Sequence, residues 1–187
     1  MGRESDDFSR FTALAKDLKI RSEIELSEVP APQRLAPFAY AISADVALPG
    51  DEEDLATGRF VLLHDPEGQE SWDGNFRCVT FIRSSLDSEM QDEPLLADVA
   101  WSWVNEALNR AGAQFGANGG TVTRASSKSF GQLAGTDGTS EIEIRASWTP
   151  TTSENLIANL NGWLYLIELA AGLSPLEEGV SSLTKRR

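Results

Sequence analysis

His64 is the side chain best suited to proton transfer in this chain, and it is the only histidine. Imidazole is the group that most readily acts as acid or base near neutral pH. Asp65 follows directly and is placed to orient the ring, and Ser71 is a nearby nucleophile. The alternative is a histidine at a strand end that enters a turn, where surface or capping histidines are more common. The sequence favours the second interpretation and predicts no catalytic residue.

Metal and cofactor chemistry lacks the ligands that it needs. Cys78 is the only cysteine, so a Cys/His zinc site has too few donors, and we expect Cys78 to be a small buried hydrophobe. The acidic residues at 51–54 and 87–93 lack the glycine and terminal glutamate of a helix-loop-helix calcium site. The glycine-rich segment 116–121 follows a helix and has no lysine, unlike a phosphate loop. No metal and no cofactor are predicted.

Four side chains are candidates for binding: Trp72, Trp101, Arg124 and Lys128. Trp72 lies in a polar turn, where an exposed aromatic ring often anchors a partner. In the alternative interpretation, the ring of Trp72 folds down as a lid over the edge of the sheet. Trp101 lies at the edge of a predicted helical stripe. Arg124 and Lys128 belong to a positive patch, for which a solvated hairpin face is favoured.

Apolar spacing predicts three helices. The first covers 8–18 and begins after Ser5, Asp6 and Asp7. The second opens after 92–94 and stops at Gly112. The third begins with a capping box of Thr151 and Glu154. Its apolar face is wider than one stripe, so it is either covered on two sides or meets a partner.

Alternating and compact apolar runs predict five strands, with turns between them. They span residues 38–48, 58–64, 75–85, 120–130 and 141–148. Residues 65–68 have turn chemistry, and 24–26 is a candidate edge strand. The predicted fold is α+β, an antiparallel sheet with packed helices in the order α-β-β-β-α-β-β-α.

Length and composition indicate one domain over 1–187, with flexible tails at 1–7 and 176–187. Sixteen Lys and Arg against 29 Asp and Glu give a net charge of −13. This charge disfavours nucleic-acid binding, which depends on neutralising phosphates. The apolar stretch 156–173 is interrupted by polar residues, so no membrane span is predicted. With no secretory signal and one cysteine, we expect a cytoplasmic protein in a reducing compartment.

Several segments together resemble an actinobacterial family known only as a domain of unknown function. They are residues 28–37, the run 58–83, GGTVTRASSKSFGQLAG at 119–135 and EIEIRASWTP at 141–150. The resemblance covers nearly the whole chain and implies an actinobacterial cytoplasmic protein. It supplies no catalytic or binding residue.

The element order resembles the fold of type III secretion chaperones, which tend to be homodimers that hold partner proteins. Because fold does not imply function, this resemblance is an analogy. The leading hypothesis is a protein-binding or chaperone-like adaptor without catalytic activity, forming a homodimer. The alternative is a small-ligand binder or enzyme that uses His64 and Asp65, with Arg83 or Arg124, in a cleft on the sheet.

Overall fold

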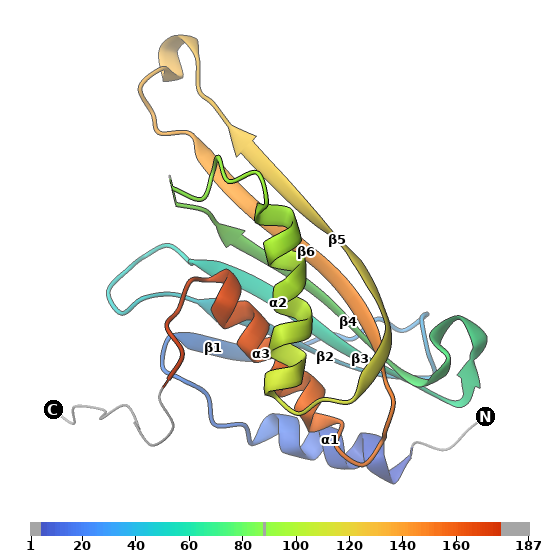
Figure 1. Cartoon of the computed structure of the whole chain (residues 1–187). Coiled ribbons are helices and arrows are strands. Elements are labelled where there is room, and N and C mark those ends of the chain that lie inside the picture. Colours follow the sequence, from blue (N-terminus) through green and yellow to red (C-terminus); the bar gives the residue numbers. More distant parts are fainter. Residues whose placement is uncertain (1–4, 88, 177–187) are drawn as a thin grey trace, which may run out of the picture.

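The computed structural model describes residues 5–87 and 89–176 as three helices packed on one sheet (Figure 1). The helices are α1 (Asp6–Lys16), α2 (Leu96–Arg110) and α3 (Ile157–Ala170). The strands are β1 (Ile24–Val29), β2 (Phe38–Val46), β3 (Ala56–Gln69), β4 (Gly74–Ser85), β5 (Phe115–Ser127) and β6 (Thr139–Pro150). Two single 3₁₀ turns, η1 (Glu70–Trp72) and η2 (Gly131–Leu133), lie in hairpin connections.

The sheet has six strands in the order β1-β2-β3-β4-β6-β5, and every neighbouring pair is antiparallel. The predicted α+β class with an antiparallel sheet and packed helices is therefore confirmed. The predicted order counts one strand too few before α2. The candidate edge strand at 24–26 is a regular strand, in which Ile24 is buried and pairs with Val46.

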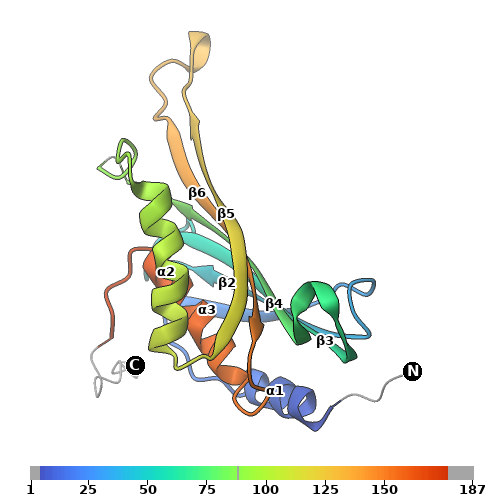
Figure 2. The ribbon, with the colours of Figure 1, turned by 45° about the vertical axis from the view of Figure 1, so that its right-hand side comes forward.

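All three helices lie on the same face of the sheet, which Figure 2 shows nearly edge-on. α3 packs on β3 and β4, and α1 and α2 flank it. Its residues are buried almost all round: Ala158, Asn159, Leu160, Gly162, Trp163, Leu164, Leu166, Ile167 and Ala170. A helix that is apolar on every side belongs in the centre of a core. The wide apolar face of α3 is therefore covered within the chain.

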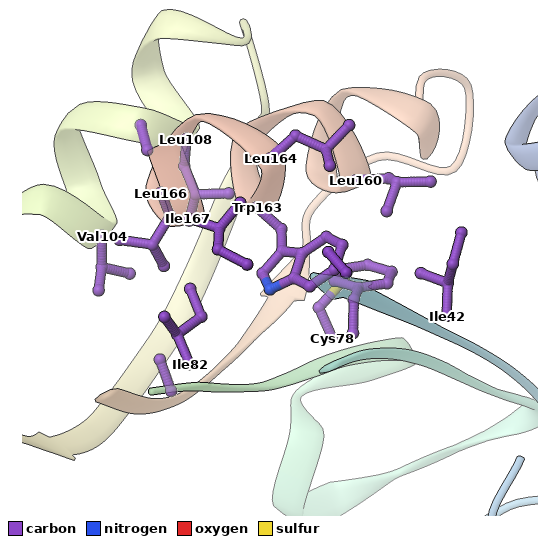
Figure 3. Packing of buried hydrophobic residues seen from close by; sticks show 14 of the residues in the cluster. Ile42, Cys78, Ile82, Val104, Leu108, Leu160, Trp163, Leu164, Leu166 and Ile167 are labelled. Carbon is purple, nitrogen blue, oxygen red and sulfur yellow. The ribbon is translucent and has the colours of Figure 1, made fainter. Parts of the chain in front are cut away.

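Two glycines allow α3 to approach its neighbours closely. A Cβ atom at Gly58 of β3 would lie 2.8 Å from Ile167 Cδ1, and one at Gly162 would lie 2.7 Å from Leu108 Cδ2 of α2. Figure 3 shows Trp163 reaching from α3 to the sheet, where Cys78 and Ile82 of β4 lie. The absence of side chains at the two glycines brings α3 into contact with both β3 and α2.

Alternation along β4 and β6 places the inner face of the sheet as predicted. On β4 the residues facing the helices are buried: Phe76, Cys78, Thr80 and Ile82. On β6 they are Ile142, Ile144, Ala146 and Trp148. The indole N–H of Trp148 donates to Asn159 Oδ1 of α3 over 2.9 Å, so its one polar atom is satisfied inside the core.

Two local predictions are wrong. The predicted capping box does not form, because α3 begins at Ile157 and Leu156 makes no side-chain cap. Thr151 instead donates its backbone N–H to the carbonyl of Gln114. Residues 65–68 do not form the hairpin turn, since β3 continues to Gln69 and η1 makes the reversal. Gly68 nevertheless has a φ of +76°, as its predicted turn role requires.

The two predicted tails lie mostly outside the described residues. At the N-terminus, α1 includes Asp6 and Asp7, which the prediction assigned to the flexible tail 1–7. Ser5 accepts a hydrogen bond from the backbone N–H of Phe8, and α1 starts at Asp6.

None of the helices within 5–87 and 89–176 combines the length and hydrophobicity that crossing a bilayer requires.

Candidate functional site: a groove on the open face of the sheet

The face of the sheet opposite the helices carries a groove of about 650 Å³. No helix within the described residues covers it (Figure 2). It is formed by two adjacent rows of residues that run across β3, β4, β6 and β5. One row is Arg59, Phe81, Arg145 and Thr121, and the next is Val61, Val79, Ser147 and Gly119. Residues directly opposite each other on neighbouring strands are close enough for their side chains to interact.

The floor of the groove is apolar although it faces solvent. Val79 is 36% exposed, and the half-buried ring of Phe81 lies beside it on the same strand face. The outer face of a half-buried strand is normally polar. Val79 and Phe81 depart from this pattern, and they make the groove a candidate contact surface.

Arginines border this floor on both sides. The guanidinium of Arg145 lies 5.3 Å from the ring centre of Phe81 and 3.5 Å from Glu143. On the β3 side, Arg59 donates a 2.6 Å hydrogen bond to the carbonyl of Pro30. Both side chains are exposed. The groove thus combines an apolar floor with two cationic borders in a chain of net charge −13.

Two further arginines of β4 extend the positive character of this face. Arg77 is held by three acceptors, the carbonyl of Ala117, Thr149 Oγ1 and Ser147 Oγ, at 2.7–2.9 Å. Arg83 makes a two-oxygen ion pair with Glu141. Arg77 and Arg83 each make three hydrogen bonds within the chain. Arg59 makes one hydrogen bond and Arg145 one ion pair, so these two keep more N–H groups free for a partner.

Trp72 closes one end of the same face. Its ring is 8% exposed and packs with Ala41, Val61 and Leu63. Small residues of the proline-rich connector, including Ala31 and Ala36, pack against this cluster. Trp72 is therefore buried as a lid over the sheet, and only the alternative interpretation of this residue agrees with its position.

His64 lies in the core, and the expectation of a surface or capping histidine is wrong. It is 2% exposed, its ring stacks 4.3 Å from that of Phe76, and Phe8 and Phe38 lie at 5.6 and 5.8 Å. Nδ1 lies 3.1 Å from the carbonyl oxygen of Asn75. A carbonyl oxygen only accepts, so Nδ1 carries a hydrogen and donates it to Asn75. Nε2 has no partner among the described residues.

Replacing His64 tests this core role. His64→Ala is expected to cost about 3 kcal/mol of unfolding free energy, because it leaves a cavity between three rings. His64→Phe is expected to recover most of that loss, since the rings stack again and the unpaired Nε2 disappears. Urea unfolding of both variants measures the difference. Equal losses in the two variants would show that the bond to Asn75 dominates.

The structure does not bring the other predicted side chains into one site. The carboxylate of Asp65 accepts from the backbone N–H of Glu67 and the side-chain amide of Gln69, whereas the His64 ring bonds to the carbonyl of Asn75. Trp101 of α2 lies over Gly120 on the inner face of the sheet. Arg124 donates to the carbonyls of Glu93 and Gln91. Lys128 lies 5.7 Å from the ring of Phe130 in the exposed hairpin.

Chemistry at Cys78 is limited by its position in the core. The side chain is fully buried, and burial raises the pKa of its thiol well above the ordinary value. It is a small buried hydrophobe, as predicted. Within 5–87 and 89–176, no three His, Cys, Asp or Glu side chains are grouped to hold a metal ion.

The groove residues Val79, Phe81 and Arg145 were not singled out from the sequence. Their signal was present, since Val79 and Phe81 lie between arginines on the strand face opposite Cys78. Two apolar residues on a face that should be polar are the feature to look for. The pairing of β4 with β6, which brings Arg145 beside Phe81, has no local signal.

Comparison with known proteins places the chain in a family without assigning it an activity. No curated protein and no solved structure matches it. One family model, described as a protein of unknown function (DUF3000), matches residues 4–181. This range includes every strand that forms the groove, and the chain belongs to the DUF3000 family.

Proposed function

We propose that this protein is a cytoplasmic, protein-binding adaptor that uses the groove on the open face of the sheet. The observation that carries the proposal is the exposed apolar floor of Val79 and Phe81 between Arg59 and Arg145. Interfaces characteristically combine an apolar centre with aromatic and arginine side chains. The groove is wide and open, which suits a protein segment better than an enclosed small molecule.

The partner is a protein segment that presents apolar side chains together with carboxylates. The apolar side chains would cover Val79 and Phe81, and the carboxylates would pair with Arg59 and Arg145. The net charge of −13 disfavours binding of an acidic segment to most of the protein, so its binding would be directed to this face. The expected homodimer and the resemblance to type III secretion chaperones stay predictions.

Selection of binding peptides tests the proposal. A random twelve-residue phage-display library would be selected on wild-type protein, on Val79→Asp and on Arg124→Glu. Val79→Asp places a carboxylate in the exposed floor, and Arg124→Glu makes the matched exposed change on the other face. We expect acidic-apolar peptides to be enriched on wild type and Arg124→Glu and to lose binding about tenfold or more on Val79→Asp.

Two results would contradict this function. The same peptides enriched equally on all three proteins would show that the groove is not the binding surface. Enrichment of basic peptides would show that the arginines do not select the partner. Circular dichroism confirms beforehand that both variants are folded.

A further inference from the structure

A second cavity, of about 390 Å³, lies between the helices on the far side of the sheet from the groove. Four parts of the chain meet there: residues 19–24, the last residue of α2, residues 161–168 of α3, and Leu176 beyond α3. Its lining is half polar in character, unlike the groove, and includes Lys19, Arg21, Arg110, Asn161, Tyr165 and Glu168. Four of the lining side chains are charged: Lys19, Arg21, Arg110 and Glu168.

The back of this cavity is a satisfied ionic cluster around Arg21. Its side chain is 6% exposed and donates to both oxygens of Glu23 at 3.0–3.1 Å. It also donates to Glu168 Oε2 at 3.3 Å and to the carbonyl of Ser174 at 3.0 Å. Because two carboxylates share this one guanidinium, the cluster has a net charge of −1, and Arg21 offers a ligand few free donors.

Arg110 is held in position by an aromatic ring, and its charge opposes the rise that burial causes in the pKa of the neighbouring Glu168. Its guanidinium lies over the ring of Tyr165, 4.2 Å from the ring centre. Within residues 5–87 and 89–176 it makes no hydrogen bond. A stacked guanidinium keeps its N–H groups free at the edge, in the planar arrangement that matches two oxygens of one anion.

Lys19 adds a second available cation from a different segment. The end of α2 accounts for a cation at Arg110, because helix dipoles favour positive charge there. It does not account for Lys19, nor for the orientation of Arg110 over Tyr165. Lys19, Arg21 and Arg110 outnumber the two carboxylates, Glu168 in the lining and Glu23 behind it, in a chain of net charge −13. The cavity is therefore an exception to the acidity of the protein.

The walls between these polar groups are apolar. Ile20, Ile24, Leu164 and Leu176 line the cavity together with the ring of Tyr165. A free inorganic ion would use the cations and leave these walls in contact with water. An anion with an apolar body satisfies both parts of the lining.

We propose that this cavity binds a small organic anion, a carboxylate or a phosphate ester. Arg110 and Lys19 bind the charged oxygens, and the amide of Asn161 donates to them. Tyr165 and Leu164 contact the apolar body. This site is independent of the groove on the open face, so each can be present without the other.

Titration with benzoate and with phenyl phosphate tests the proposal on ¹⁵N-labelled full-length protein. We expect saturable shifts of the Arg110 Nε–H and Asn161 signals. Arg110→Gln and Lys19→Gln are each expected to weaken binding about tenfold or more. Arg124→Gln, an exposed arginine outside the cavity, serves as the matched control and leaves binding unchanged. Tighter binding of one probe identifies the headgroup as carboxylate or phosphate.

Two outcomes would overturn the proposal. One is that neither probe produces saturable shifts at these residues up to ~10 mM. The other is that Arg110→Gln and Lys19→Gln bind both probes as tightly as wild type. Since Lys19 and Arg110 are exposed, both variants are expected to fold.

Discussion

Replacing Gly120 by alanine is expected to destabilise the protein by about 3 kcal/mol, because the new methyl group has no space. A Cβ atom there would lie 2.0 Å from the carbonyl oxygen of Arg145 and 2.9 Å from Ala146 Cα, both on the main chain of β6. Trp101 Cζ3 lies 2.8 Å away on the other side. A main chain cannot rotate away as a side chain does, so β5 would have to separate from β6.

Gly119 is the matched control for this experiment. It is the preceding residue of β5, and a Cβ atom there would meet nothing within 4 Å. Gly119→Ala is therefore expected to change the unfolding free energy by less than about 1 kcal/mol. Urea unfolding followed by tryptophan fluorescence compares the two variants. Equal stability of the two would mean that β5 and β6 are not as closely paired at Gly120 as described.

Arg21→Met is expected to cost about 3 kcal/mol at neutral pH, because it leaves two carboxylates without their common partner. Glu168 is the more affected, since it is half-buried and burial already raises its pKa despite the nearby Arg21. The pKa of Glu23 is lowered, mainly by the hydrogen bond from Arg21. Lys16→Met is the control, since its 3.9 Å pair with Glu28 is exposed and contributes little.

The loss in Arg21→Met should depend on pH in a definite direction. Without Arg21, the pKa of Glu168 rises further above its unfolded value, so the native state loses stability as pH rises through that range. The stabilisation from the lowered pKa of Glu23 is present above its unfolded pKa, and the variant loses it there. Both effects make the loss larger at pH 7.5 than at pH 5, as urea unfolding at the two pH values measures. A loss that is equal at both would contradict the assignment to these carboxylates.

The parts of the fold that the sequence predicts are those with a periodic signal. Alternation along 76–82 and 142–148 predicts the inner face of the sheet. The spacing of Phe8, Phe11, Leu14, Ala15 and Leu18 predicts the apolar face of the first helix; Phe8, Phe11 and Ala15 are buried, whereas Leu14 is 46% exposed. The wide apolar face of α3 predicts that two sides are covered, with a partner protein as the open alternative. In the structure, β3, β4, α1 and α2 contact α3, so its apolar sides are covered within the chain and not by a partner.

The wrong predictions concern residues whose position depends on distant partners. His64 is buried because Phe8, Phe38 and Phe76 come from three other elements. Thr151 and Glu154 match a capping motif, but the backbone of Thr151 bonds to the distant Gln114, and α3 starts only at Ile157.

Both proposed binding sites are likewise assembled from distant segments. In the cavity, Arg21 and Glu168 are separated by 147 residues along the chain. In the groove, the row from Arg59 to Thr121 crosses four strands. A local sequence motif cannot predict such arrangements, because the residues come together only in the folded chain.

The central position of α3 has a consequence for synthesis on the ribosome. The six strands and α1 and α2 are all made before residues 157–170, which fill the middle of the core. Until those residues emerge, the inner face of the sheet, with Phe60, Ile82 and Trp148, lacks the helix that covers it. The nascent chain therefore exposes this apolar surface until α3 has been translated. During that interval, chaperones that bind nascent chains could bind the exposed inner face of the sheet.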